Sequence, residues 1–404
     1  MRRLVGRIRP YPWGSRTAIA ALQRRPVPSE TPEAELWLGA HPEAPAAVRE
    51  GDTDTDLLRL IEADPEKVLG ATVMSAHGPQ LPFLLKVLAA DQPLSLQAHP
   101  DLAQAKAGYA AEEAAGVPLD APHRRYVDTN HKPELLVALS EFDALCGFRP
   151  VAESARLVER LAVPELEPVV ASLRHSDPEH ALREAVTRIF ATPDERRESL
   201  VAAVRQAAAG LATTRPEYRL AVELADRYPS DVGVVVALLL NLVRLAPGEA
   251  IYMPAGNLHS YLRGVGVEVM ASSDNVLRGG LTSKHVDVPE LLRVLRYTEL
   301  PEPRLAAVEV ADGVVSWPVP VPDFRLVKVT LSAGRRVTLP DSEAPHVVLC
   351  VAGEASVADS VDSVVLRSGE AAFGTAYGGP VTLTGEGELY QATVGISDRF
   401  VSFA

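Results

Sequence analysis

The sequence predicts a mainly β protein with an α-helical insertion. Short apolar segments punctuated by Pro and Gly fill residues 1 to about 50, and Val-rich segments alternate with Gly, Pro and Asp turns after residue 303. Between them, residues 151–245 are rich in Ala, Leu, Glu and Arg, with apolar residues recurring three and four positions apart. This texture is typical of an all-helical block, and the Val-rich end of the chain is typical of a sandwich or barrel.

Length and charge restrict the number of domains and the kinds of partner. The 404 residues are too many for one hydrophobic core, so two or three domains are expected. Lys and Arg number 40 against 53 Asp and Glu, which gives a net charge of -13. Because that field repels nucleic acid and anionic membranes, we expect neither as a partner.

The cysteines and the apolar runs indicate a cytoplasmic protein. Cys146 and Cys350 lie far apart and outside any C-x-x-C pattern, so they predict neither a disulfide framework nor a thiolate zinc site. The basic N-terminus is not followed by an apolar core, so no secretory signal is expected. The longest apolar run, residues 232–245, is too short to span a bilayer and predicts a buried helix.

In the first strand-rich region, residues 53–68 predict an amphipathic helix capped by Asp54 or Thr55. Residues 81–90 predict an apolar strand that contains one lysine, Lys86. Since burying an unpaired ammonium is costly, Lys86 either extends its head group to water or lines a site.

Further elements follow in order. Residues 101–116 predict an Ala-rich helix, and a polar loop over residues 124–130 leads to a strand at 135–139. After the helical block, residues 247–270 predict strands, and a short helix is expected to begin near Pro289.

Residues 94–100 contain a pair of polar side chains two positions apart. On a strand, Gln97 and His99 share one face, their apolar neighbours face the other way, and Pro100 ends the strand. A carbonyl oxygen and an imidazole nitrogen held side by side can coordinate one metal ion. An ordinary hydrogen-bonded pair is the more common meaning of a Gln beside a His.

Two other segments strengthen the metal hypothesis. One is the run His131-Lys132-Pro133-Glu134. In the other, residues 247–259, a strand runs into a Pro-x-Gly turn that presents His259. The spacing of this turn resembles the second motif of cupins, which are double-sheet jelly rolls. The first cupin motif is absent, and the Gln97-x-His99 pair takes its place.

Nearly the whole chain resembles the type I mannose-6-phosphate isomerases, also called phosphomannose isomerases. The blocks that carry the resemblance are residues 11–14, 34–42, 97–100, 130–134, 252–259 and 271–284. The resemblance implies one Zn²⁺ per chain, held by Gln97, His99, Glu134 and His259. It also implies a catalytic cupin domain at 1–150 and 233–300, a helical inserted domain at 151–232, and a C-terminal cupin-like β domain at 301–404.

The implied activity is a zinc-dependent aldose–ketose isomerisation. It interconverts mannose 6-phosphate and fructose 6-phosphate through a cis-enediol and feeds mannose and GDP-mannose metabolism. Because Glu134 is the one anionic ligand, the site keeps a net positive charge, and an open coordination position marks a catalytic zinc. Such an ion can polarise a carbonyl or neutralise a developing enediolate.

The resemblance also implies roles for charged and aromatic residues around the metal. The catalytic candidates, which stabilise the intermediate or move the proton, are Arg278, Glu268, His131 and Lys132. The substrate-binding candidates are Lys86, Lys284, Trp13 and Asp274. The two lysines would act as point charges toward phosphate or hydroxyl groups. The alternatives are a solvated surface position for Arg278 and packing on a sheet for Trp13.

Two other classes compete with this hypothesis. A dioxygenase-type cupin would favour Fe(II) on two His and one carboxylate, and a Gln ligand argues against it. A non-catalytic sugar-phosphate-binding cupin would share the fold, which alone does not separate the two, but the intact ligand set argues against it. We therefore expect a small sugar phosphate as the partner of a monomeric chain.

Overall fold

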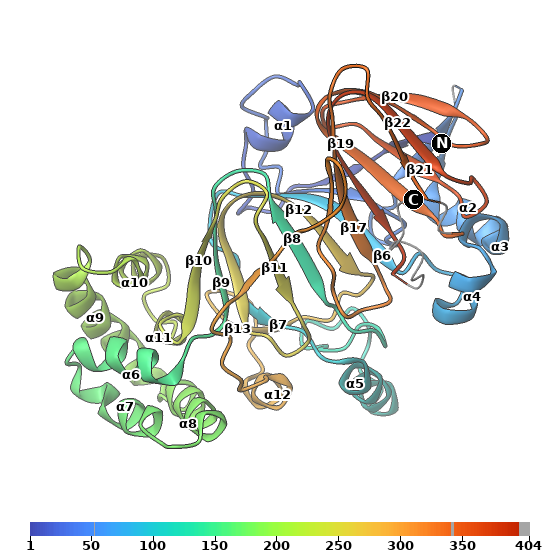
Figure 1. Ribbon diagram of the computed structural model, residues 1–404. Coiled ribbons are helices and arrows are strands. Elements are labelled where there is room, and N and C mark those ends of the chain that lie inside the picture. Colours follow the sequence, from blue (N-terminus) through green and yellow to red (C-terminus); the bar gives the residue numbers. More distant parts are fainter. Residues whose placement is uncertain (52, 341–342, 396–404) are drawn as a thin grey trace.

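The computed structural model describes residues 1–51, 53–340 and 343–395, in which antiparallel strands form two large sheets beside a group of helices (Figure 1). The predicted class, mainly β with an α-helical insertion, is confirmed. The end of the expected C-terminal domain, residues 396–404, lies outside the described residues.

The first sheet, called the barrel sheet here, follows the order β14-β11-β8-β12-β6-β3-β2, and β7, β9, β10 and β13 extend it from β12. Its strands are β2 (Arg7–Arg9), β3 (Glu35–Leu38), β6 (Phe83–Ala90), β7 (Leu96–Ala98), β8 (Glu134–Ala138), β9 (Phe142–Phe148), β10 (Leu240–Leu245), β11 (Ala250–Met253), β12 (His259–Ala271), β13 (Leu277–Gly280) and β14 (Arg304–Leu305).

The second sheet, called the C-terminal sheet here, also includes strands from the start of the chain. Its strands are β1 (Arg2–Val5), β4 (Ala47–Glu50), β5 (Thr53–Asp56), β15 (Val308–Ala311), β16 (Val314–Ser316), β17 (Arg325–Leu331), β18 (Arg336–Leu339), β19 (His346–Ala358), β20 (Ser363–Arg367), β21 (Ala371–Gly374) and β22 (Val381–Thr393). β1 joins this sheet by pairing with β21, where Leu4 lies opposite Ala371. The boundary between the sheets therefore does not follow the order of the sequence.

The helices gather mainly between residues 151 and 237. All α-helices of the described residues are α1 (Ala18–Leu22), α2 (Leu57–Ala63), α3 (Pro65–Leu69), α4 (Ala71–His77), α5 (Leu102–Ala114), α6 (Val151–Arg160), α7 (Glu167–Leu173), α8 (Pro178–Phe190), α9 (Asp194–Leu211), α10 (Pro216–Arg227), α11 (Gly233–Ala237) and α12 (Val288–Val294). In the described part of the chain, no helix is both long and apolar enough to cross a bilayer.

Two of the expected helices were partly wrong. Thr53–Asp56 forms strand β5, because its Thr-rich backbone pairs with β4, and the helix begins only at Leu57. The helix predicted at residues 232–245 ends at Ala237, and β10 follows it because Leu240–Leu245 pairs with β9. In both places pairing with a distant strand overrides the local pattern.

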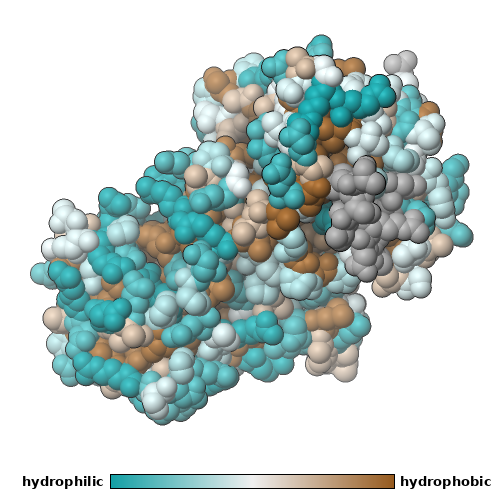
Figure 2. Space-filling model, in the orientation of Figure 1, coloured by the Kyte–Doolittle hydropathy of each residue, from teal (hydrophilic) through white to brown (hydrophobic). Residues whose placement is uncertain are grey.

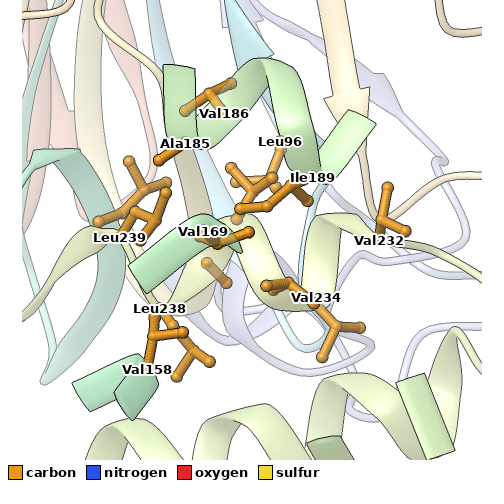
Figure 3. Packing of buried hydrophobic residues seen from close by; sticks show 14 of the residues in the cluster. Leu96, Val158, Val169, Ala185, Val186, Ile189, Val232, Val234, Leu238 and Leu239 are labelled. Atoms are coloured by element: carbon orange, nitrogen blue, oxygen red, sulfur yellow. The ribbon is translucent and has the colours of Figure 1, made fainter. Parts of the chain in front are cut away.

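The helices α6–α11 form a lobe at one side of the barrel sheet, and Figure 2 shows its visible side covered largely by hydrophilic residues. Its apolar core continues onto the outer face of the strand that carries Gln97. Leu96 and Ala98, the neighbours of Gln97, are fully buried in this core. Figure 3 shows Leu96 there together with Ile189 of α8 and Val234 of α11. The helical lobe thus fixes β7 from behind.

The barrel sheet has two faces with different surroundings. In β6, Leu85 and Val87 belong to the core that the barrel sheet shares with the C-terminal sheet, whereas Leu88 belongs to the core inside the barrel. Because side chains alternate along a strand, Lys86 must also face the barrel interior. The barrel interior therefore contains a polar layer. The opposite, outer face of the barrel sheet is buried against the C-terminal sheet.

Candidate metal centre

Three ligand-type side chains meet inside the barrel. The nitrogen and oxygen atoms of His99, Glu134 and His259 that could hold a metal ion all lie within 4.8 Å of one another. His99 Nε2 is 3.4 Å from Glu134 Oε1, and His259 Nε2 is 3.2 Å from Glu134 Oε2. Gln97 lies beside the group, with the nitrogen of its side-chain amide 3.4 Å from His259 Nε2. The structure thus brings together the residues on which the metal hypothesis rests.

The backbone positions these side chains by strand pairing. His259 opens β12 and lies opposite Gln97 of β7, and Glu134 opens β8 opposite Met270 of β12. The turn before His259 needs Gly256, whose φ is +74°. A Cβ atom at Gly256 would lie 2.9 Å from the carbonyl oxygen of Val294, so a larger residue does not fit.

Hydrogen bonds from the ring nitrogens orient both imidazoles. His99 Nδ1 lies 2.7 Å from the carbonyl oxygen of Asn275, and His259 Nδ1 lies 2.9 Å from that of Asn257. A carbonyl oxygen accepts a hydrogen bond from Nδ1–H, so the proton stays on Nδ1 and Nε2 of each ring has the lone pair of a ligand. Both Nε2 atoms therefore point at Glu134 in the form that binds metals.

The electrostatics of the cluster favour the same protonation states. Burial lowers the pKa of His99 to about 4, so its imidazole is neutral near pH 7. Burial alone would raise the pKa of Glu134, but His99 and Lys132 beside it hold that pKa well below its usual range. A neutral imidazole next to an ionised carboxylate is the donor set that a divalent metal requires.

His99 Nε2 and Glu134 Oε2 are buried and make no hydrogen bond of good geometry among the described residues, although Glu134 Oε1 and His259 Nε2 lie 3.4 Å and 3.2 Å from them. His99 and Glu134 are almost completely buried. An unsatisfied buried polar atom is costly, and two that converge on one point call for a further atom there. A metal ion coordinated by nitrogen and oxygen fits this requirement.

Lys86 is buried, and its ammonium is paired. Its Nζ atom lies 2.8 Å from Glu268 Oε2 and 3.4 Å from Glu35 Oε1. Burial alone would lower the pKa of Lys86, but the two carboxylates, Glu268 first, raise it above its ordinary value. Lys86 therefore lines the polar layer of the barrel rather than extending to water.

The two carboxylates beside Lys86 are themselves held by aromatic donors. The Tyr261 hydroxyl donates to Glu268 Oε1 at 2.6 Å, and Trp37 Nε1 donates to Glu35 Oε2 at 2.6 Å. Burial raises the pKa of Glu268, and Lys86 opposes this effect. Glu268 is thus engaged on both oxygens by its neighbours.

Arg278 and Lys284 lie near each other without acidic partners. Neither has an ion-pair partner among the residues that the structure describes. Burial lowers the pKa of Arg278, and burial together with the charge of Arg278 lowers the pKa of Lys284. Two neighbouring cations without a counter-ion form a suitable place for an anionic group of a ligand.

The segment before Glu134 alternates its side chains between the two faces of the barrel sheet. Lys132 Nζ lies 3.4 Å from Glu134 Oε1, so Lys132 is beside the cluster. His131 points to the other face, where its Nε2 atom lies 2.9 Å from Asp323 Oδ2. The alternation of an extended segment therefore separates these two catalytic candidates.

Two substrate-binding candidates contact other protein groups. The Trp13 ring stacks on Tyr11 with 5.7 Å between centroids and packs against the apolar core inside the barrel. Asp274 Oδ2 lies 3.0 Å from His41 Nε2. His41 in turn meets the Trp37 ring edge-on, so Asp274 is tied to the Glu35 and Lys86 layer.

Sequence reasoning missed several residues of this site, among them Glu35, Tyr261, Asp128 and Asn275. Tyr261 had a usable signal, because it lies two positions after His259 on the same strand and so shares its face. Asn275 and Asp128 had no such signal. Asn275 donates to Asp128 Oδ1 and to the Asn130 carbonyl oxygen, contacts that join segments far apart in the sequence.

Known proteins match this chain along almost its whole length. Residues 1–151 match the family model described as phosphomannose isomerase type I, catalytic domain. The chain is 38% identical over 392 residues to mannose-6-phosphate isomerase from Escherichia coli (strain K12), which covers 96% of this chain and 98% of that protein. A mutant phosphomannose isomerase from Salmonella typhimurium has a TM-score of 0.91 at 34% identity, covering 98% of this chain and 99% of that one. A zinc-bound mannose 6-phosphate isomerase has a TM-score of 0.90 at 35% identity, covering 97% and 99%.

The barrel sheet with its buried imidazole–carboxylate cluster defines a cupin-type, metal-binding protein. Within that class, the chain belongs to the type I phosphomannose isomerase family. Membership of this family favours neither of the alternatives considered from the sequence, a dioxygenase-type cupin and a non-catalytic sugar-phosphate-binding cupin.

Proposed function

We propose that the chain is a zinc-dependent aldose–ketose isomerase that interconverts mannose 6-phosphate and fructose 6-phosphate through a cis-enediol. The observation that carries the proposal is the buried cluster of His99, Glu134 and His259, whose ligand-type atoms all lie within 4.8 Å of one another. Its support is family membership together with a matching relative that holds zinc.

Four side chains would hold the ion: Gln97, His99, Glu134 and His259. When bound, a zinc ion supplies a Lewis acid that polarises a sugar carbonyl or neutralises negative charge on the enediolate oxygens. The orienting bonds from the carbonyl oxygens of Asn275 and Asn257 hold both imidazoles ready for this role.

Lys132 is our candidate for the group that moves the proton. The isomerisation removes a proton from the carbon beside the carbonyl and returns it one carbon over. Of the three candidates, Lys132 lies beside the cluster, His131 faces the opposite side of the sheet, and Glu268 is engaged by Lys86 and Tyr261. The position of Lys132 beside the cluster therefore favours it as the proton-transfer group. The buried Lys86–Glu268 pair belongs to the same polar layer of the barrel interior.

Arg278 and Lys284 divide the negative charges of the substrate between them in this proposal. Arg278 lies on β13 beside Gln97 and would face the developing enediolate. Lys284, farther along the chain, would contact the phosphate as a point charge. Trp13 and Asp274 would complete the substrate site, Asp274 through His41.

We further propose the division into a catalytic domain at 1–150 and 233–300, a helical domain at 151–232, and a C-terminal β domain at 301–404. The helices α6–α10, which lie within 151–232 and between β9 and β10 of the barrel sheet, support it. We also propose that the enzyme is monomeric. A reducing, cytoplasmic location is supported by two buried free cysteines.

The test combines metal analysis with an isomerase assay. The purified protein is measured for zinc and iron content, then assayed with mannose 6-phosphate and with fructose 6-phosphate. We expect about one zinc per chain and turnover in both directions. Chelator-treated protein should lose turnover and regain it with added zinc. Bound iron with oxygen-dependent activity would favour a dioxygenase, and tight sugar-phosphate binding without turnover would favour a non-catalytic binder.

A further inference from the structure

A polar pair joins a loop of the C-terminal part of the chain to the catalytic segment. Asp323 lies in the loop between β16 and β17, and its Oδ2 atom is 2.9 Å from His131 Nε2. The Asp323 side chain is 4% exposed and that of His131 is 20% exposed, so water competes little with this bond.

The Asp323 loop is firmly anchored. The residue that follows, Phe324, and Trp317 at the start of the loop are both buried in the core between the two sheets. Gly395 donates its backbone N–H to the Pro322 carbonyl oxygen at 2.9 Å. Asp323 is therefore a fixed point of the C-terminal part of the chain.

The partner of Asp323 is one residue from the reacting centre. His131 precedes Lys132, and Lys132 contacts Glu134 in the metal cluster. On the barrel side, Asn275 grips the same segment through the Asn130 carbonyl oxygen. The segment 128–134 is thus held by Asn275, in the loop between β12 and β13, and by Asp323, in the loop between β16 and β17.

We propose that Asp323 is a positioning residue of the active site, which acts through His131 to set the placement of Lys132 and Glu134. The proposal rests on the function proposed above. It gives the C-terminal domain a task in the reaction, because the barrel alone cannot supply this contact. Small displacements of a reacting group can cost up to about a hundredfold in rate, so a single hydrogen bond at this place is enough to matter.

The experiment compares Asp323→Ala, Asp323→Asn, His131→Ala and the double variant Asp323→Ala/His131→Ala in the full chain. Asp323→Ala should lower kcat about tenfold and change KM less than about twofold, because binding groups are untouched. Asp323→Asn keeps an acceptor oxygen for His131 and should restore kcat to within about threefold of wild type. The double variant should be no worse than His131→Ala, because both residues act as one unit.

Ser368→Ala is the matched control. Ser368 Oγ donates to the Leu22 carbonyl oxygen at 2.9 Å, a contact from the C-terminal sheet to α1 that does not involve the segment 128–134. Its kcat should equal that of wild type. Amide hydrogen exchange supplies a readout that needs no turnover: residues 128–134 should exchange faster in Asp323→Ala than in Ser368→Ala.

Three outcomes would overturn the proposal. One is a wild-type kcat for Asp323→Ala. Another is unchanged exchange of residues 128–134, with any loss confined to thermal stability. A much larger loss in His131→Ala than in Asp323→Ala would assign the proton transfer to His131 and also remove the positioning role. If wild-type protein fails to turn over mannose 6-phosphate, the proposed function fails, and the exchange measurement still decides whether Asp323 holds the segment.

Discussion

Arg278 lies directly opposite Gln97 where β13 pairs with β7. Side chains that face each other across an antiparallel pair share one side of the sheet, with about 5 Å between their Cβ atoms. Gln97 in turn reaches His259 Nε2 at 3.4 Å. The register therefore places a permanent positive charge beside the metal cluster.

Arg278→Ala should lower kcat far more than it raises KM. An enediolate develops negative charge only as the reaction proceeds, and a fixed guanidinium stabilises that state more than the ground state. The expected loss is about 10²–10³ in kcat with unchanged zinc content. Steady-state kinetics and elemental analysis test both points. A wild-type kcat would remove Arg278 from the catalytic residues.

Lys284→Ala is the comparison for Arg278. If Lys284 binds the phosphate in ground state and transition state alike, KM should rise while kcat is nearly kept. The same pattern in Arg278→Ala would mean that the arginine also grips the phosphate. Measuring both variants with one substrate series separates the two roles.

Lys86→Met should destabilise the protein strongly. The substitution keeps the volume but leaves the Glu35 and Glu268 carboxylates buried without their cation. Breaking a buried pair in this way costs about 3–5 kcal/mol in the free energy of unfolding. Urea unfolding measures the loss, and Lys86→Met/Glu268→Gln should recover part of it. The exposed pair Arg205–Asp226 is the control, because Arg205→Ala should change stability by less than about 1 kcal/mol. Equal effects of the two substitutions would contradict the account.

Asn275→Ala should weaken zinc binding, although its side chain touches no ligand. Its amide holds the backbone at Val127 and Asn130, and its own carbonyl oxygen orients His99. Loss of such an orienting partner typically costs about 10–100-fold in metal affinity. Competition with a chelator measures the affinity. Ser316→Ala, which removes a buried hydrogen bond within the C-terminal sheet, should leave zinc affinity unchanged.

The helical lobe should lose stability in acid because of Glu217. Burial would raise the pKa of this carboxyl, but hydrogen bonds from Arg215 and Arg149 lower it from 4.5 to about 2. A lowered pKa means that the ionised form stabilises the folded state. This contribution is complete above about pH 4.5 and is lost as the pH falls toward 2. Melting temperatures across this window should fall less steeply for Glu217→Gln than for wild type. If melting temperature falls equally with pH in Glu217→Gln and in wild type, the ion pairs of Glu217 do not contribute to acid stability.

The sequence predicted the parts of the fold that depend on local pattern. The helix at residues 101–116 appears as α5, whose Asp101 and Gln104 form a capping box, a signal visible in the sequence. The strand β5 and the strand β10 could not be predicted, because each forms by pairing with a segment far away. The membership of β1 in the C-terminal sheet has the same cause.

In the candidate site, too, the features that depend on local spacing could be predicted and those that depend on distant contacts could not. The convergence of Gln97 and His99 follows from a two-residue spacing on one strand, which can be read directly. The partner of His131 could not be predicted, because Asp323 lies in a loop with no motif of its own. The state of Lys86 was also open, since burial with Glu35 and Glu268 depends on the register of three strands. The alternation of side chains along a strand predicts which face of the sheet a residue occupies. The pairing of distant strands determines which residues it contacts on that face.

If the buried cluster holds the catalytic zinc, His259→Ala should remove both the metal and the activity. Elemental analysis of the purified variant should show zinc falling from about one per chain to nearly none, with isomerase turnover lost. Circular dichroism should stay near that of wild type, because the substitution keeps the backbone pairing of β12 and the hydrophobic cores do not include this side chain. His175→Ala, at an exposed histidine of the helical lobe, should keep full zinc and activity. Full zinc occupancy or wild-type turnover in His259→Ala would contradict the account.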